Sequence, residues 1–286
     1  MKVCVLIRSV IDSRVPLPPD ASGERPIRES MKRMINPGDW QALQQIRSLA
    51  PAASIHLIAL GPPSLDEDLS WSLAEGAKSA TRIWDPSFTG ADLQGKARAL
   101  AALLKELSPE LVLAGETSLD QVEGGLAGAL AAEAELVFLS GISCLERVAR
   151  DRVTVIRRYE RGKRQRLEVK TPVFLALDDS TAPPPLSEAN LASLLPHLRR
   201  GVEARGLRSL GLREEQVGSR AAGTARIRIR FPEPVITRPK TPALSLSAEE
   251  RLRSLIDTGI ERQEGEVLTG EPEEMVTRLV DYLIKK

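Results

Sequence analysis

The stretch from Leu111 to Glu133, LVLAGETSLDQVEGGLAGALAAE, constrains the fold more than any other part of the chain. Its first four residues are apolar and stop at Gly115, which is typical of a buried parallel strand. A polar loop ending in two glycines follows, and then a helix of small residues. Open α/β sheets bind ligands at such a strand–loop–helix step, because the helix N-terminus presents free backbone N–H groups. Glycines in this pattern also occur at tight helix–sheet contacts without a ligand, so both interpretations stay open.

The composition favours a folded protein without a nucleic-acid or membrane partner. Of the 286 residues 42% are apolar and 28% are charged, which is enough apolar material for a sizeable core. The net charge of +1 gives no general attraction to nucleic acid or to an anionic membrane, and aromatic residues make up only 3%. The two cysteines and the two isolated histidines predict a reducing compartment and no metal site. With no signal-peptide pattern and no apolar run of bilayer length, we expect a cytoplasmic protein without membrane insertion.

Apolar runs alternate with helical patterns through the first half of the chain. Strands are expected at Val3–Ile7, Ser54–Leu60, Thr81–Trp84, Leu111–Gly115 and Leu136–Leu139, with amphipathic helices between most of them. This alternation predicts an open, mostly parallel sheet with helices on both faces, hence the α/β class. From about residue 151 the pattern changes to an added β-hairpin and one last buried strand.

The domain organisation follows from these composition shifts. We expect an α/β domain over residues 1–185, a loop or helix segment over 186–212, a linker over 213–247 and a helical arm over 248–286. The final helix of this arm, Glu271–Lys286, carries an apolar stripe that needs a surface to bury against. Its own domain or a second chain would serve, and the long linker slightly favours the second chain.

Several short motifs occur in the order found in one known family. After the first strand the chain reads Val-Ile-Asp, the helix after the long polar loop is led by Met-Ile-Asn-Pro-Gly-Asp, and Gly-Pro follows the second strand. Leu-Ala-Glu-Gly-Ala in the next helix and the glycine loop continue the series, and a segment before the last strand and one near the end of the chain complete it. The motifs lie at Val10–Asp12, Met34–Asp39, Gly61–Pro62, Leu73–Ala77, Leu111–Gly125, Leu167–Pro172 and Gly265–Val280. In this order the chain resembles the beta subunits of electron transfer flavoproteins.

The resemblance implies a fold of the adenine-nucleotide-alpha-hydrolase-like, Rossmann-like type. It implies an electron-carrying subunit of a heterodimer rather than a catalyst on its own, so we expect no catalytic residues. The partner would be an electron transfer flavoprotein alpha subunit that holds most of the FAD, and a dehydrogenase or quinone oxidoreductase would exchange electrons with the complex. AMP or a second FAD would occupy the beta-subunit site, and the helical arm would contact the alpha subunit.

The family's nucleotide site carries over by position onto eight residues. They are Leu6, Asn36, Pro37, Leu60, Gly61, Asp120, Gly124 and Gly125. The partner-docking loop would fall near residues 190–198, with Leu194 or Leu195 as the apolar anchor. The nucleotide loop departs from the family, because Gly124-Gly125-Leu126 stands where Thr-Gly-Gln is usual and Glu123 adds a negative charge beside the phosphate position.

Two other functions use a related fold. A stand-alone adenine-nucleotide-binding module of the universal-stress-protein type would share the sheet and the glycine loop, but the long C-terminal tail would have no use in it. An ATP-pyrophosphatase would need a glycine-rich loop after the first strand, whereas this chain reads Arg-Ser-Val-Ile-Asp at 8–12.

Overall fold

The computed structural model describes residues 1–12, 15, 32–119, 125–178, 201–219, 221–223, 247, 249, 275, 276 and 280. The chain divides into two units, Met1–Phe231 and Pro232–Lys286. The first unit contains every strand described below. In the second unit only five residues are described, and four of them, Glu249, Met275, Val276 and Val280, are helical. The expected docking residues Leu194 and Leu195, and most of the linker and arm, lie outside the described residues.

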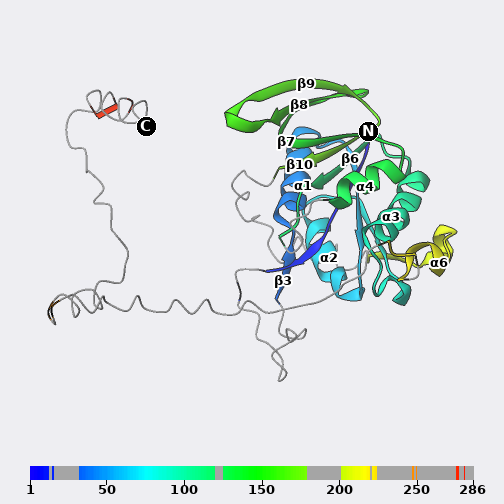
Figure 1. Ribbon diagram of the computed structural model, residues 1–286. Coiled ribbons are helices and arrows are strands. Elements are labelled where there is room, and N and C mark those ends of the chain that lie inside the picture. Colours follow the sequence, from blue (N-terminus) through cyan, green and yellow to red (C-terminus); the bar gives the residue numbers. More distant parts are fainter. Residues whose placement is uncertain are drawn as a thin grey trace. The chain divides into compact units, whose positions relative to one another are not determined.

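A nine-stranded sheet forms the centre of the first unit (Figure 1). Its strand order is β11-β5-β4-β1-β6-β10-β7-β8-β9. Pairing is parallel from β11 through to β7 and antiparallel between β7, β8 and β9. The strands are β1 Lys2–Leu6, β4 Ser54–Leu60, β5 Ser79–Ile83, β6 Leu111–Gly115, β7 Val137–Val148, β8 Arg152–Arg158, β9 Arg164–Lys170, β10 Val173–Leu177 and β11 Glu203–Arg205. The expected parallel α/β sheet with an added hairpin is confirmed.

A small antiparallel pair lies beside this sheet. It joins β2 (Ser9–Ile11) to β3 (Arg33–Ile35), so the two ends of the long polar loop meet. Of the residues between the two strands, only Asp12, Val15 and Lys32 are described. Because β3 leads directly into the first helix, this pair fixes where that helix begins.

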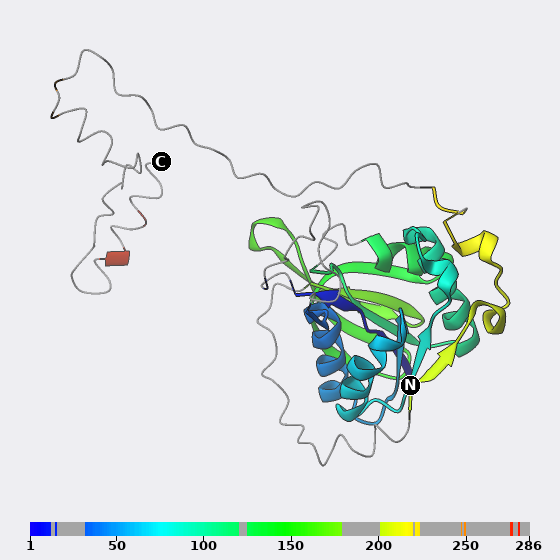
Figure 2. The same ribbon diagram turned by 90° about the horizontal axis from the view of Figure 1, so that it is seen from below.

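Helices cover both faces of the sheet (Figure 2). They are α1 Pro37–Leu49, α2 Asp66–Ala74, α3 Leu93–Leu107, α4 Gly125–Glu133 and the short α6 Glu214–Val217. Alternate residues of the parallel strands point to opposite faces, and both faces are buried. In β1, Val3 and Val5 join the core beneath α1 and α2, whereas Cys4 and Leu6 join the core beneath α3 and α4.

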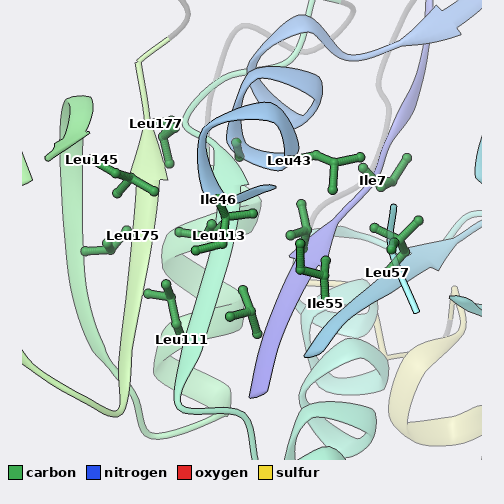
Figure 3. Packing of buried hydrophobic residues seen from close by; sticks show 14 of the residues in the cluster. Ile7, Leu43, Ile46, Ile55, Leu57, Leu111, Leu113, Leu145, Leu175 and Leu177 are labelled. Carbon is green, nitrogen blue, oxygen red and sulfur yellow. The ribbon is translucent and has the colours of Figure 1, made fainter. Parts of the chain in front are cut away.

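The core beneath α1 is built from aliphatic side chains of the helix and the four central strands. Leu43 and Ile46 project from α1 toward Ile7, Leu113 and their neighbours (Figure 3). Every residue of β6 is buried. The central strands are therefore apolar on both faces, which explains why short continuous apolar runs, rather than alternating ones, predicted them.

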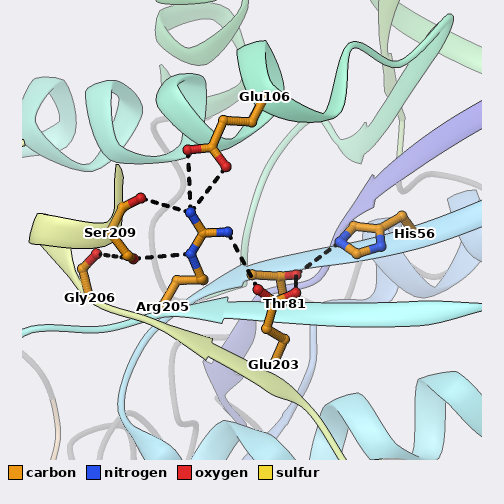
Figure 4. A network of polar contacts seen from close by, with 7 residues as sticks. All are labelled: His56, Thr81, Glu106, Glu203, Arg205, Gly206 and Ser209. Carbon is orange, nitrogen blue, oxygen red and sulfur yellow. Dashed lines mark hydrogen bonds and ion pairs between the residues drawn. The ribbon is translucent and has the colours of Figure 1, made fainter. Parts of the chain in front are cut away.

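Residues 201–219 pack against the rest of the first unit. Strand β11 extends the sheet beyond β5, and Arg205 binds Glu106 of α3 at 3.0 Å (Figure 4). Further along, Arg98 of α3 donates to the carbonyl of Gln216, and a Cβ added at Gly95 would meet the Val217 carbonyl at 2.3 Å. The segment that leads toward the second unit is thus held to α3 at several points.

No helix among the described residues is long and apolar enough to cross a membrane.

Candidate functional site

The strand order places a topological switch point between β1 and β6. From β1 the chain adds β4 and then β5 on one side, and afterwards adds β6 on the other side. Loops that leave neighbouring strands in opposite directions separate at the carboxyl ends of those strands and leave a crevice for ligands. The carboxyl ends in question are Leu6 of β1 and Gly115 of β6. The candidate site is the group of residues at this edge.

A buried ion pair occupies this edge. Arg8 follows β1, and Asp39 lies in the first turn of α1. The Arg8 Nη2 atom lies 2.7 Å from Asp39 Oδ1, and Nε lies 2.9 Å from Oδ2, so the contact is bidentate. The Asp39 side chain is fully buried and that of Arg8 is 14% exposed. Such a fork-shaped pair fixes the orientation of both side chains as well as their separation.

The same two side chains hold the end of β6. The Gly115 amide donates to Asp39 Oδ1 at 2.6 Å, and Arg8 donates to the carbonyls of Gly115 at 2.7 Å and Thr117 at 3.0 Å. The Arg8 amide also donates to Asp39 Oδ2. One ion pair therefore joins the ends of β1 and β6 to the start of α1, and it satisfies backbone groups that would otherwise need a ligand or water.

Two glycines allow the start of α1 to approach the end of β6. A Cβ added at Gly38 would lie 2.9 Å from the Cα of Gly115, and a Cβ added at Gly115 would meet Gly38 and Asn36 at the same distance. Real Cβ atoms do not approach other atoms this closely, so only glycine, which has no Cβ, fits at either position. The glycine that ends the apolar run at 111–114 is thus part of a backbone contact between helix and strand.

Asn36 is buried beside this contact and precedes Pro37, the first residue of α1. Its amide nitrogen Nδ2 donates to the Thr117 carbonyl at 2.9 Å, and its side chain does not cap the helix. Among the residues that the structure describes, no donor lies within hydrogen-bond distance of its Oδ1. Asn36 therefore positions the loop after β6 with one end of its carboxamide and keeps an acceptor at the other end.

Other expected site residues lie at the carboxyl ends of the neighbouring strands. Leu6 is buried at the end of β1, and Leu60 and Gly61 close β4, the next strand. Gly61 is held on both sides, because its amide donates to the Ile83 carbonyl and its own carbonyl accepts from Arg82. The structure thus brings Leu6, Asn36 and the end of β4 to one edge of the sheet.

The glycine loop is described only from Gly125, the first residue of α4. A Cβ at Gly125 would meet Leu93 of α3 at 2.9 Å, so this glycine permits close packing between the two helices. Asp120 and Gly124 lie outside the described residues. The positions carried over from the family therefore stay predictions at that loop.

Sequence reasoning did not assign a role to Arg8 or to Asp39. In the sequence, Asp39 is part of a motif that starts a helix, and Arg8 belongs to a loop without glycine. A signal was present in the sequence, because a single cation directly after a buried strand and an acid in the first turn of the next helix are both expected at a carboxyl edge. Their pairing across 31 positions depends on the tertiary fold, which local patterns do not reveal.

The sheet order, the switch point and the helix starts define an α/β domain of the doubly wound, nucleotide-binding type. A family model described as the electron transfer flavoprotein domain matches residues 27–194, which is more than half of the chain. The chain therefore belongs to the electron transfer flavoprotein family, and its relatives place it with that family's beta subunits.

Three relatives illustrate the similarity. The electron transfer flavoprotein subunit beta of Methylophilus methylotrophus is 28% identical over 62% of this chain and 67% of its own length. The subunit of the same name from Clostridium acetobutylicum is 34% identical over 52% of this chain and 58% of its own length. Protein FixA of Bradyrhizobium diazoefficiens is 26% identical over 81% of this chain and 82% of its own length. The match to the first two thus spans between about half and two thirds of each protein.

Proposed function

We propose that this chain is the beta subunit of an electron transfer flavoprotein, which pairs with a flavin-holding alpha subunit and passes electrons between a dehydrogenase and a downstream acceptor such as a quinone oxidoreductase. The observation that carries the proposal is the match of the family's domain to residues 27–194, which include the ends of β6 and β10, α1 and the hairpin. FAD bound mainly by the alpha subunit would supply the redox chemistry. The chain's own residues would shape the surface that faces it.

Co-expression with the alpha subunit encoded in the same genome tests this function. We expect a one-to-one complex on size-exclusion chromatography with the absorption spectrum of bound flavin. A colourless beta chain that elutes alone when both subunits are present would contradict the proposal. Release of the bound nucleotides by denaturation, followed by mass spectrometry, identifies what the complex holds.

We further propose that the beta-subunit site takes an adenine nucleotide, either AMP or the adenosine part of a second FAD. Support comes from Asn36, whose buried Oδ1 has no donor among the described residues, while its Nδ2 is anchored to Thr117. Such an acceptor fits an exocyclic amine of the kind that adenine carries. The start of α4 would offer free backbone N–H groups to a phosphate.

Isothermal titration of AMP into the nucleotide-stripped heterodimer measures this site. In Asn36→Ala we expect the Kd for AMP to rise by about tenfold or more, since one hydrogen bond to a buried acceptor is lost. Asn36→Ala also removes the contact with Thr117, so Gln41→Ala on the same helix serves as a control for general loosening of α1. Equal AMP affinity in wild type and Asn36→Ala would exclude Asn36 from the site.

A further inference from the structure

The turn of the β8–β9 hairpin concentrates positive charge. We define the basic tip as residues 157–166, RRYERGKRQR, which contain six basic side chains and one acidic side chain. The whole chain has a formal net charge of only +1, so the rest of the protein is net acidic. In Figure 1 the hairpin forms the outer edge of the sheet, and no strand among the described residues pairs with the far side of β9.

Four of the six cations of the basic tip have no carboxylate partner within the described part of the chain, and one of these four, Arg157, contacts Tyr159 instead. Arg158 binds Asp178 at 2.8 Å, and Arg166 binds Glu146. By contrast, Arg161, Lys163 and Arg164 are exposed and have no carboxylate within ion-pair distance among the described residues. Like charges held together without counter-charges repel one another, so these three side chains do not stabilise the fold through ion pairs.

The basic tip is nevertheless held in a defined shape. The Arg157 guanidinium lies over the Tyr159 ring, 5.0 Å from its centroid, and Arg157 also donates to the Tyr159 hydroxyl. That hydroxyl donates to Gln165 on the opposite strand at 2.9 Å. An arginine and a tyrosine fixed together at the surface are typical of interface residues, because they offer large contact area at low entropic cost.

The backbone conformation of the turn also exposes a cation. Arg161 has a φ of 57°, which is a left-handed backbone conformation that residues other than glycine and asparagine seldom adopt. A Cβ added at the neighbouring Gly162 would meet nothing within 4 Å, so this end of the hairpin projects away from the rest of the described chain. A cation is held out from the turn at a conformational cost.

The base of the basic tip is joined to the edge of the sheet where the candidate site lies. Asp178, the partner of Arg158, directly follows β10. Next to it Glu116, which directly follows β6, accepts a hydrogen bond from the amide of Gly141 in β7 at 3.0 Å. A protein that contacts the basic tip would therefore lie over the carboxyl edge of the sheet.

We propose that the basic tip is the electrostatic docking surface for an acidic face of the alpha subunit. This inference rests on the proposed function and adds the chemistry of the contact. A nucleic acid is the weaker occupant, because Tyr159 is the only aromatic residue of the tip and Arg157 already covers a face of its ring. Complementary charges mainly accelerate association and set its dependence on salt.

The test compares two triple variants that remove equal charge from the same ribbon. The tip variant is Arg161→Gln/Lys163→Gln/Arg164→Gln. The control variant is Arg147→Gln/Arg150→Gln/Lys170→Gln, whose three exposed cations lie at the other end of β7, β8 and β9. Association with the purified alpha subunit is followed by stopped-flow fluorescence between about 0.01 and 1 M NaCl, where the Debye length falls from about 30 to about 3 Å.

For wild type and the control variant we expect fast association at low salt that slows steeply as salt is added. In the tip variant the low-salt rate constant should fall by about tenfold, and its salt dependence should flatten. Equal rates and equal salt dependence in the tip and control variants would overturn the docking surface while leaving the heterodimer intact. If wild type forms no complex, both the proposed function and the docking surface fail. The proposal would also be overturned if wild type binds a fluorescent RNA oligonucleotide and the tip variant does not.

Discussion

At the scale of single residues, the Arg8–Asp39 pair joins the ends of two strands to the start of α1 at the candidate site. Asp39 is fully buried and accepts hydrogen bonds from the guanidinium and from two backbone amides. Replacing a buried pair with apolar groups costs little in some proteins, whereas removing one partner leaves an uncompensated charge. The pair therefore behaves as a unit, and single and double variants distinguish this unit from two independent contacts.

We expect Asp39→Leu to lower the free energy of unfolding by about 3–5 kcal/mol, because the Arg8 guanidinium and two backbone amides lose the buried carboxylate that accepts their hydrogen bonds. The double variant Arg8→Met/Asp39→Leu should lose clearly less than the sum of the two single variants. Urea denaturation of the four proteins provides the measurement. Additive losses would show that the two side chains stabilise the fold separately.

Close approach at Gly115 gives a second prediction at this scale. Gly115→Ala should destabilise the domain by about 1–3 kcal/mol, because its Cβ would lie 2.9 Å from the backbone of Gly38. Gly128→Ala in α4 is the control, since its Cβ would meet only Phe138 at an ordinary 3.7 Å and alanine favours helix by up to about 1 kcal/mol. A melting temperature of Gly115→Ala equal to that of wild type would contradict the close contact between Gly115 and Gly38.

At the scale of elements, the sequence was most informative where both faces of a strand are buried. The apolar runs 3–7, 54–60 and 111–114 predicted β1, β4 and β6, since local hydrophobicity is enough to identify a buried strand. Strand β11 has only three residues, and two of them are exposed. Its place in the sheet depends on pairing with β5 and on Arg205, which no local pattern reveals.

The polar contacts that hold β11 predict a dependence on pH. His56 Nε2 lies 3.0 Å from Thr81 Oγ1, and Glu203 of β11 is the acceptor for that hydroxyl group (Figure 4). Burial lowers the pKa of His56 from its ordinary value; Glu203 opposes this shift, and Lys2 adds to it. The unfolded chain therefore takes up a proton on His56 more readily than the folded chain, so stability falls as the pH drops below about 6.5.

Comparison of wild type with His56→Gln isolates this contribution. Glutamine stays neutral at every pH and can still bond to Thr81, so the variant should lose less stability between about pH 7 and pH 5 than wild type does. Melting temperatures measured across this range give the difference. Parallel curves for the two proteins would mean that His56 binds protons equally in the folded and unfolded states.

At the scale of the whole molecule, the candidate site was only partly predictable. Asn36, Leu6 and Gly61 were named from motifs, and the strand order brings them to one edge of the sheet. Arg8 and Asp39 were missed, because their contact joins segments that only the fold brings together. Motif positions reveal which loops meet at the edge, but the hydrogen bonds that fill the edge depend on side-chain geometry in three dimensions.

The division of the chain into two units gives the last prediction. Val276 and Val280 each have helical backbone and are 60% and 46% exposed, and both belong to the apolar stripe that the sequence predicts for Glu271–Lys286. If this face binds the alpha subunit, Val276→Asp/Val280→Asp should weaken the heterodimer by about tenfold or more, since two buried apolar contacts become unpaired charges. The melting temperature of the isolated beta chain should not change, because the first unit has its own core. Thr277→Asp/Arg278→Gln lowers the net charge by the same two units at neighbouring positions of the sequence and serves as the control. Analytical ultracentrifugation with the alpha subunit measures the affinities, and equal weakening by both variants would attribute the effect to charge rather than to the apolar face.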